Sequence, residues 1–207
     1  MAGVTAVIDP LLNKTLRPIL AKLASPLVAR GVRADQVTIA GFGLGLLAVP
    51  ALAMQWYGLA LVLILVNRVA DGLDGAVARL TTTSDAGGYI DSVFDFIFYS
   101  AIPFGFLLAD LEQNAVAAAF LMLTFMGTGA TFLAFAAVAS KRGIDNPNYP
   151  NKSLYYMGGI TEGFETILAF VAFCLWPQWF PALALSFAAL CWLTAAIRLW
   201  SGYQTLR

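Results

Sequence analysis

Hydrophobic residues in this chain gather into long runs rather than into the alternating pattern of exposed strands. Six runs approach the length of about 20 residues that an α-helix needs to cross the hydrocarbon core of a bilayer. The first holds Gly41 and Gly45, four positions apart, a pattern that permits close contact between helices. We therefore predict an all-α membrane protein with six transmembrane helices, at about residues 36–55, 57–78, 88–109, 114–139, 160–176 and 180–199.

The segment before the first run has a different pattern. In residues 8–30, apolar positions recur every three to four residues, and basic residues lie between them. The pattern is typical of an amphipathic helix in the membrane interface, although a helix packed on the protein fits it equally well. We accordingly expect an N-terminal amphipathic juxtamembrane segment, residues 1–34, before the six-helix transmembrane domain, residues 35–207.

Composition supports a membrane protein and narrows its chemistry. The chain is 60% hydrophobic and 12% charged, whereas soluble domains carry about 25% charged residues. It contains no histidine, which excludes histidine-based catalysis and most zinc sites. The two cysteines, Cys174 and Cys191, lie in separate apolar runs and are interpreted as core residues.

Charges in the connections predict the orientation of the helices. Lys and Arg occur before the first run, at the junction of the second and third, between the fourth and fifth, and after the sixth. The other three connections contain neither residue. The positive-inside rule therefore places both termini in the cytoplasm, and we expect an integral protein of the inner (cytoplasmic) membrane.

Four aspartates lie where the second and third runs meet. Asp71 and Asp74 share one face of the second helix, and Asp91 and Asp95 share one face of the third. The stretch between the pairs is polar and contains glycine, as a turn between antiparallel helices should be. Both pairs should thus reach the same depth near the cytoplasmic surface, and acidic residues inside a membrane are functional by default.

Four carboxylates this close need cations, because like charges and desolvation disfavour their ionised forms. Oxygen ligands suit Mg²⁺ or Mn²⁺, and four carboxylates suit two ions about 3.5–4 Å apart, the arrangement used on phosphate substrates. The alternative is an ion-pair network with Arg68 and Arg79. Two arginines, however, cannot balance four aspartates.

Glycine and arginine near the aspartates fit a phosphate-bearing ligand. Gly75 follows Asp74 directly and Gly87 precedes Asp91 by one turn. Glycine inside a helix costs up to about 1 kcal/mol relative to alanine, and is tolerated where a ligand such as a nucleotide approaches the backbone. Arg79 can bind a phosphate through its guanidinium, or can instead anchor its helix at the interface.

The residues in this region, taken together, resemble the signature of the CDP-alcohol phosphotransferase (CDP-alcohol phosphatidyltransferase) family. All eight signature positions are present in order: Asp71, Asp74, Gly75, Ala78, Arg79, Gly87, Asp91 and Asp95. Residues 31–42 also resemble the Pro-Asp-x-Val-Thr segment of several members, with Ala34 in place of the proline. The resemblance implies an amphipathic helix, six transmembrane helices and a homodimer.

The resemblance also implies the reaction: transfer of a substituted phosphoryl group from a CDP-linked donor to an alcohol, with release of CMP. The implied ligands of two Mg²⁺ or Mn²⁺ ions are Asp71, Asp74, Asp91 and Asp95, and Asp95 is also the implied general base. The implied donor-binding residues are Asp35, Thr38, Asp71, Gly75, Ala78, Arg79, Ser84 and Gly87.

The signature leaves both substrates open. We expect CDP-diacylglycerol as donor and a small polar alcohol as acceptor, with the bilayer and a second copy of the chain as further partners and no nucleic acid. The alternative within the family is transfer from CDP-choline or CDP-ethanolamine to diacylglycerol. An ion or metal transporter, with the aspartates as an ion path, is an alternative of a different class, and an inactive family member is a third.

The expected acceptor region is residues 140–167. Its cations, Lys141, Arg142 and Lys152, can bind an acceptor phosphate or can be ordinary positive-inside charges. Glu162 and Glu165 can contact a cationic acceptor or simply favour a helix N-terminus. Phosphatidylinositol-phosphate synthases resemble this region but carry arginines beside the two glutamates, and their absence here argues against inositol phosphate.

Overall fold

The computed structural model describes residues 8–144 and 159–207, and every regular element in them is helical. The all-α prediction is therefore confirmed. The elements are α1 (Ile8–Ala29), α2 (Ala34–Leu46), α3 (Ala48–Ala53), α4 (Tyr57–Leu80), α5 (Asp85–Ala109), α6 (Leu111–Lys141), α7 (Gly163–Leu175), a 3₁₀ turn (Pro177–Trp179) and α8 (Phe180–Leu206).

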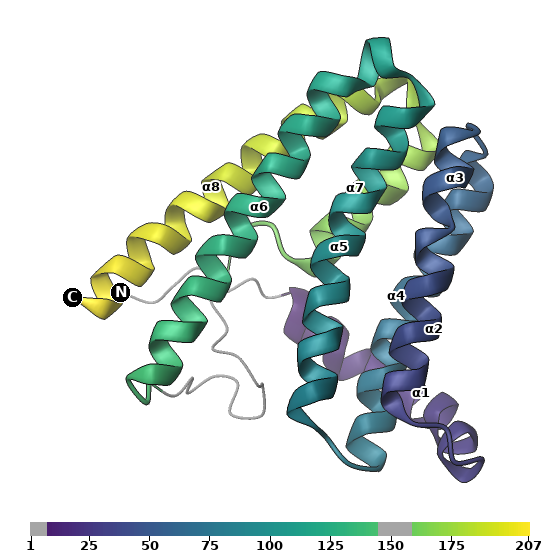
Figure 1. Cartoon of the computed structure of the whole chain (residues 1–207), viewed down its shortest axis with the longest axis vertical. Helices are drawn as coiled ribbons and strands as arrows, with labels where there is room; N and C mark the ends of the chain where they lie inside the picture. The colour runs from purple at the N-terminus through teal and green to yellow at the C-terminus, as the bar shows by residue number, and fades with distance from the viewer. Residues whose placement is uncertain (1–7, 145–158) are drawn as a thin grey trace.

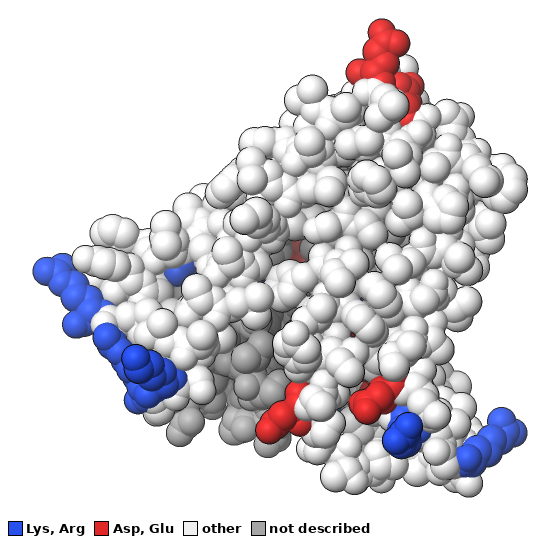
Figure 2. Space-filling model, viewed as in Figure 1, with Lys and Arg blue, Asp and Glu red and all other residues white. Residues whose placement is uncertain are grey.

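The helices form two groups that meet at one end of the molecule. Helices α2 to α5 run alongside one another, whereas α6 and α8 pack together and slope away from α5 toward the other end (Figure 1). Figure 2 shows acidic side chains at the tip where the groups meet and most of the visible lysines and arginines toward the opposite end. The tip includes the α5–α6 junction, where Asp110 caps α6 by accepting a hydrogen bond from the amide of Gln113.

Four stretches of the described chain are long and apolar enough to cross a bilayer: Ala34–Ala53, Asp85–Ala109, Leu111–Lys141 and Pro177–Leu206. The chain is thus a membrane protein, but two of the six predicted spans do not meet this description. Helix α7 has only 13 residues, because Thr161 and Glu162 belong to the turn before it. Helix α4 has 24 residues, but charged side chains interrupt its second half.

The spacing of Gly41 and Gly45 permits close contact between helices, and the structure shows such a contact. A Cβ added to Gly41 would collide with Ala70 of α4, and one added to Gly45 would lie 2.7 Å from the side-chain nitrogen of Asn67. The Asn67 side chain also donates a hydrogen bond of 3.0 Å to the carbonyl of Gly41. Helix α2 is therefore fixed against α4 at the level of the aspartates.

Helix α1 packs on this helix pair and keeps a second apolar face. Ala24 is fully buried against Ala76 and Val77 of α4. Ile19 and Leu23 are about half exposed (54% and 51%). Packing on the protein is thus observed, and the exposed face also fits a helix at a membrane surface.

A core of aromatic rings joins the two helix groups. Phe98 and Phe106 of α5 are fully buried with Phe170 of α7 and Phe180 of α8. The rings of Phe106 and Phe180 stack with centroids 4.4 Å apart. Such packing fixes α5, whose other end carries Asp91 and Asp95.

Candidate active site

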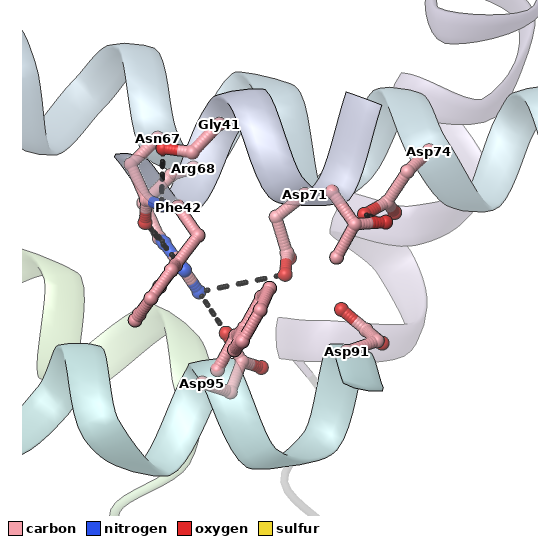
Figure 3. A pocket seen from close by; sticks show the side chains of 10 residues that line it. Gly41, Phe42, Asn67, Arg68, Asp71, Asp74, Asp91 and Asp95 are labelled. Atoms are coloured by element: carbon pink, nitrogen blue, oxygen red, sulfur yellow. Dashed lines mark hydrogen bonds and ion pairs between the residues drawn. The ribbon is translucent and has the colours of Figure 1, made fainter. Parts of the chain in front are cut away.

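A pocket between α2, α4 and α5 contains all four predicted aspartates (Figure 3). Its walls come from segments far apart in sequence, and the stacked rings of Phe42 and Phe94, 4.0 Å apart, link α2 to α5 there. The lining residues are Thr38, Gly41, Phe42, Asn67, Arg68, Asp71, Asp74, Asp91, Phe94 and Asp95.

Three of the aspartates converge closely. Asp71, Asp91 and Asp95 each offer one carboxylate oxygen within 4.8 Å of the others, and Figure 3 shows the three carboxylates facing one another. The turn that joins their helices contains only residues 81–84. Three of the four carboxylates predicted to converge therefore do so, and three oxygens this close fit a hard divalent cation.

Asp74 lies in the same pocket but has a separate partner. It is only 6% exposed and accepts a hydrogen bond of 2.6 Å from the hydroxyl of Thr38. Thr38 lies one turn before Gly41 on α2, so the close helix contact brings its hydroxyl to α4. The structure thus gives Thr38, predicted as a donor-binding residue, an orienting contact with Asp74.

Arg68 forms part of the ion-pair network considered as the alternative to metal binding. Its Nη1 donates a hydrogen bond of 2.8 Å to Oδ1 of Asp95 and lies 3.8 Å from Oδ1 of Asp71. Arg79 does not continue this network in the described structure, because its guanidinium lies over Gly75, where an added Cβ would be 3.2 Å from Nη1. One arginine therefore serves two of the four aspartates.

Asn67 was not predicted as a site residue, and Arg68 was predicted only as a counter-charge. Asn67 accepts hydrogen bonds from both Nε and Nη2 of Arg68. The spacing of Arg68, three residues before Asp71 on one helix face, was a usable indication of contact. The role of Asn67 depends on its hydrogen bond to Gly41 of α2, and the spacing of residues along the chain does not indicate that contact.

A second pocket, of about 250 Å³, lies beside the turn between α4 and α5. At this pocket the start of α2 lies next to the start of α5. Asp35 and Ser84, both predicted to bind the donor, therefore line the same pocket. Its lining residues are Val28, Gly31, Val32, Arg33, Asp35, Thr81, Thr82 and Ser84.

Gly87 lies where these segments meet. A Cβ on Gly87 would be 3.0 Å from both Oδ1 of Asp35 and Oγ of Ser84. Ser84 also caps α5, because its hydroxyl accepts a hydrogen bond of 3.0 Å from the amide of Gly87. The structure thus brings together three predicted donor-binding residues, while Ala78 lies on α4 two residues before its end.

The predicted acceptor residues lie elsewhere. Lys141 and Arg142 are exposed at the end of α6, where Arg142 donates to the carbonyl of Leu206. Glu162 is 7% exposed; it accepts a hydrogen bond of 2.8 Å from the amide of Gly159, and its own amide donates to Glu165. These observations fit the alternative interpretations, in which Lys141 and Arg142 are ordinary positive-inside charges and Glu162 and Glu165 favour a helix N-terminus.

None of these four residues lines either pocket described above. Lys152, the remaining predicted acceptor residue, lies outside the described residues.

Residues 32–200 match the family model of the CDP-alcohol phosphatidyltransferases. This chain belongs to that family. The membership makes it an enzyme of phospholipid synthesis and sets aside the transporter alternative.

The transferase is similar to two known proteins at the level of sequence. It is 52% identical over 201 residues to the inner membrane protein YnjF of Escherichia coli K12, which covers 97% of this chain and 98% of that protein. It is 36% identical over 95 residues to the archaetidylinositol phosphate synthase of Pyrococcus horikoshii, covering 45% of this chain and 50% of that protein.

The fold is similar to that of the phosphatidylinositol phosphate synthase PgsA1 of Mycobacterium tuberculosis. A crystal structure of PgsA1 with CDP-DAG bound has a TM-score of 0.71 and 21% identity, covering 90% of this chain and 94% of that one. A PgsA1 structure in complex with manganese and citrate gives the same score and identity, covering 89% and 88%. At this identity the likeness establishes the fold alone.

Proposed function

We propose that this transferase moves the phosphatidyl group of CDP-diacylglycerol to the hydroxyl of a small water-soluble alcohol and releases CMP. The observation that carries the proposal is the convergence of Asp71, Asp91 and Asp95, with Asp74 in the same pocket. The family supports a CDP-linked donor, and the PgsA1 structure with CDP-DAG bound supports its diacylglycerol group.

The four aspartates are proposed to hold two divalent ions, Mg²⁺ or Mn²⁺. Their carboxylate oxygens are the ligand type that these ions prefer, and manganese in the similar PgsA1 structure supports the same class of metal. When bound, the ions supply positive charge that neutralises the pyrophosphate and the departing CMP. Thr38 orients Asp74 for this role through the 2.6 Å hydrogen bond.

Asp95 is proposed to be the general base. A free alcohol is a poor nucleophile, so a carboxylate must accept its proton as the new bond to phosphorus forms and the bond to CMP breaks. Asp95 belongs to the converging group and has Oδ1 bonded to Arg68, so we assign acceptance of the proton to its other oxygen.

The donor is proposed to extend from the aspartates to the second pocket. Arg79, with Gly75 beneath its guanidinium, and Ala78 would contact the CDP moiety near the end of α4. The nucleotide would lie against Asp35, Ser84 and Gly87. Support comes from the pocket of about 250 Å³ that Asp35 and Ser84 line, and from the close approach of Gly87 to both.

We propose that α4 and α7 complete a set of six transmembrane helices, with both termini and the active site at the cytoplasmic side of the inner membrane. The gathering of basic residues toward one end supports this orientation, and the similarity to an inner membrane protein supports the location. The chain divides at about residue 34 into the amphipathic segment and the catalytic domain. A homodimer is part of the proposal through family resemblance alone.

The acceptor is proposed to arrive from the same side, where Lys141 and Arg142 are exposed and Lys152 follows in sequence. Glu162 and Glu165 already bond backbone amides, so contact with the acceptor would be an additional role. Transfer from CDP-choline or CDP-ethanolamine to diacylglycerol is the competing assignment.

The test uses the purified protein in detergent with CDP-diacylglycerol and Mg²⁺ or Mn²⁺. Serine, glycerol 3-phosphate and inositol phosphate are supplied one at a time, and CMP and the lipid product are measured. We expect CMP release that depends on one of these alcohols. Transfer from CDP-choline to diacylglycerol, without any turnover of CDP-diacylglycerol, would contradict the proposal.

A further inference from the structure

Arg68 lies in the aspartate pocket but does not belong to the eight signature positions. Its side chain is only 14% exposed, in a helix that we propose crosses the membrane. A cation at such a position is costly unless polar groups surround it. The contacts of Arg68 therefore indicate its role in the pocket.

The guanidinium is held from two directions. On one side, Nε and Nη2 donate to Oδ1 of Asn67 at 2.8 Å and 2.5 Å, and Asn67 is itself bonded to the carbonyl of Gly41. On the other side lie two aromatic rings, Phe98 with its centroid 4.6 Å from the guanidinium carbon and Tyr99 at 5.3 Å. The hydroxyl of Tyr99 is also 3.3 Å from Nη1.

These contacts leave Nη1 aimed at the carboxylates. It donates to Oδ1 of Asp95 at 2.8 Å, while Asp71 lies farther away at 3.8 Å (Figure 3). Because α2 holds Asn67 and the aromatic core holds Phe98 and Tyr99, Nη1 is a fixed point rather than the end of a mobile side chain. This hydrogen bond restricts rotation of the Asp95 carboxylate.

We propose that Arg68 is a positioning residue for the proposed base. It holds Oδ1 of Asp95 and thereby orients this carboxylate within the group that it forms with Asp71 and Asp91, and it does not contact substrate. The inference rests on the proposed function of the aspartate site. Hydrogen-bond donors behind carboxylate ligands orient them in metal sites, and losing such a partner typically reduces metal affinity or activity about 10–100-fold.

A role as a counter-charge alone predicts different behaviour. Lysine at position 68 would keep the charge but lose the guanidinium fork that Asn67 holds. If only charge matters, Arg68→Lys should behave as wild type. Arg68→Gln should then bind a metal cation more tightly, because a nearby positive charge has been removed.

The experiment measures Mn²⁺ binding by electron paramagnetic resonance without substrate, together with kcat and the KM for CDP-diacylglycerol. We expect Arg68→Lys and Arg68→Gln both to weaken Mn²⁺ binding about 10–100-fold. Both should lower kcat, while KM for the donor changes by less than about twofold, because interactions in the donor pocket remain. The matched control Arg207→Gln removes one exposed charge at the chain end and should match wild type.

Tyr99→Phe provides a milder second variant, which keeps the ring and its packing against Phe125 and Phe170. Loss of one hydrogen bond to Nη1 should weaken Mn²⁺ binding about two- to tenfold. If Tyr99→Phe and Arg68→Lys both bind Mn²⁺ and turn over as wild type does, the positioning role is wrong. If wild type neither binds Mn²⁺ nor releases CMP, the proposed function fails and the inference fails with it.

Discussion

The aspartate pocket and the turn before α7 both carry acidic residues near helix ends, but those residues have different partners. In the pocket, Asp74 bonds to a hydroxyl of α2 and Asp95 to a guanidinium of α4, so side chains of different helices orient one another. At the turn, Glu162 and Glu165 bond backbone amides within their own segment. Side chains of neighbouring helices therefore orient the carboxylates of the first region, whereas those of the second stabilise the start of their own helix.

The comparison indicates in which region of the molecule a change of residue can change the substrate. The chemistry proposed for this transferase lies on α4 and α5, whose four aspartates line one pocket. The residues predicted to choose the acceptor lie at the end of α6 and before α7. Changes in the first region should abolish the reaction, and changes in the second should alter which alcohol is used.

Removal of metal should have the largest effect. EDTA is expected to abolish CMP release, because converging carboxylates without cations cannot hold a pyrophosphate, and added Mg²⁺ or Mn²⁺ should restore it. Full turnover in a metal-free preparation would refute the metal site.

Asp95→Asn should follow in size. Loss of a general base typically lowers kcat about 10²–10⁴-fold, and loss of a ligand adds to that. Binding of CDP-diacylglycerol, measured by calorimetry, should be partly retained because Arg79 and the second pocket are unchanged. Wild-type turnover by this variant would assign the base to another residue.

Arg79→Ala tests the donor side of the first region. A charge-assisted hydrogen bond to phosphate is worth about 1.5–3 kcal/mol, so donor affinity should fall about ten- to 150-fold. The acceptor KM should stay the same. Unchanged donor affinity would reduce Arg79 to an anchor at the membrane interface.

The smallest effects are expected at the acceptor region. If the acceptor carries a phosphate, Lys141→Gln, Arg142→Gln or Lys152→Gln should raise its KM a few-fold at saturating donor, the pattern of lost uniform binding. If the acceptor is serine or an amino alcohol, Glu162→Gln should raise KM instead. Constant acceptor KM in all four variants would locate acceptor binding outside residues 140–167.

Helix content and the aspartate cluster were predictable because both follow from spacing along one chain. Apolar runs of suitable length predict helices, and residues three or four apart share a helix face. The spacing of Gly41 and Gly45 likewise permitted the close contact that the structure shows. The short turn brings Asp91 and Asp95 to Asp71, as its polar residues indicated.

The remaining features depend on contacts between helices. Hydropathy along the chain carries no information on those contacts. The hydrogen bonds of Asn67 to α2 and of Thr38 to Asp74 are examples. Hydropathy also misjudged the start of α7, because it could not show that Glu162 caps the helix rather than entering it. Nor could it show the break between α2 and α3 at Leu47.

The four-residue turn between α4 and α5 has a consequence for folding. The entropy cost of closing a loop rises with its length, so contacts between near neighbours in sequence form with the smallest loss. Arg68 and Asp95 are 27 positions apart in sequence. Once α4 and α5 have formed, only the turn between them remains flexible. The hairpin of α4 and α5 can therefore assemble its carboxylates as a local folding unit, before α6 and α8 have closed the far side of the molecule.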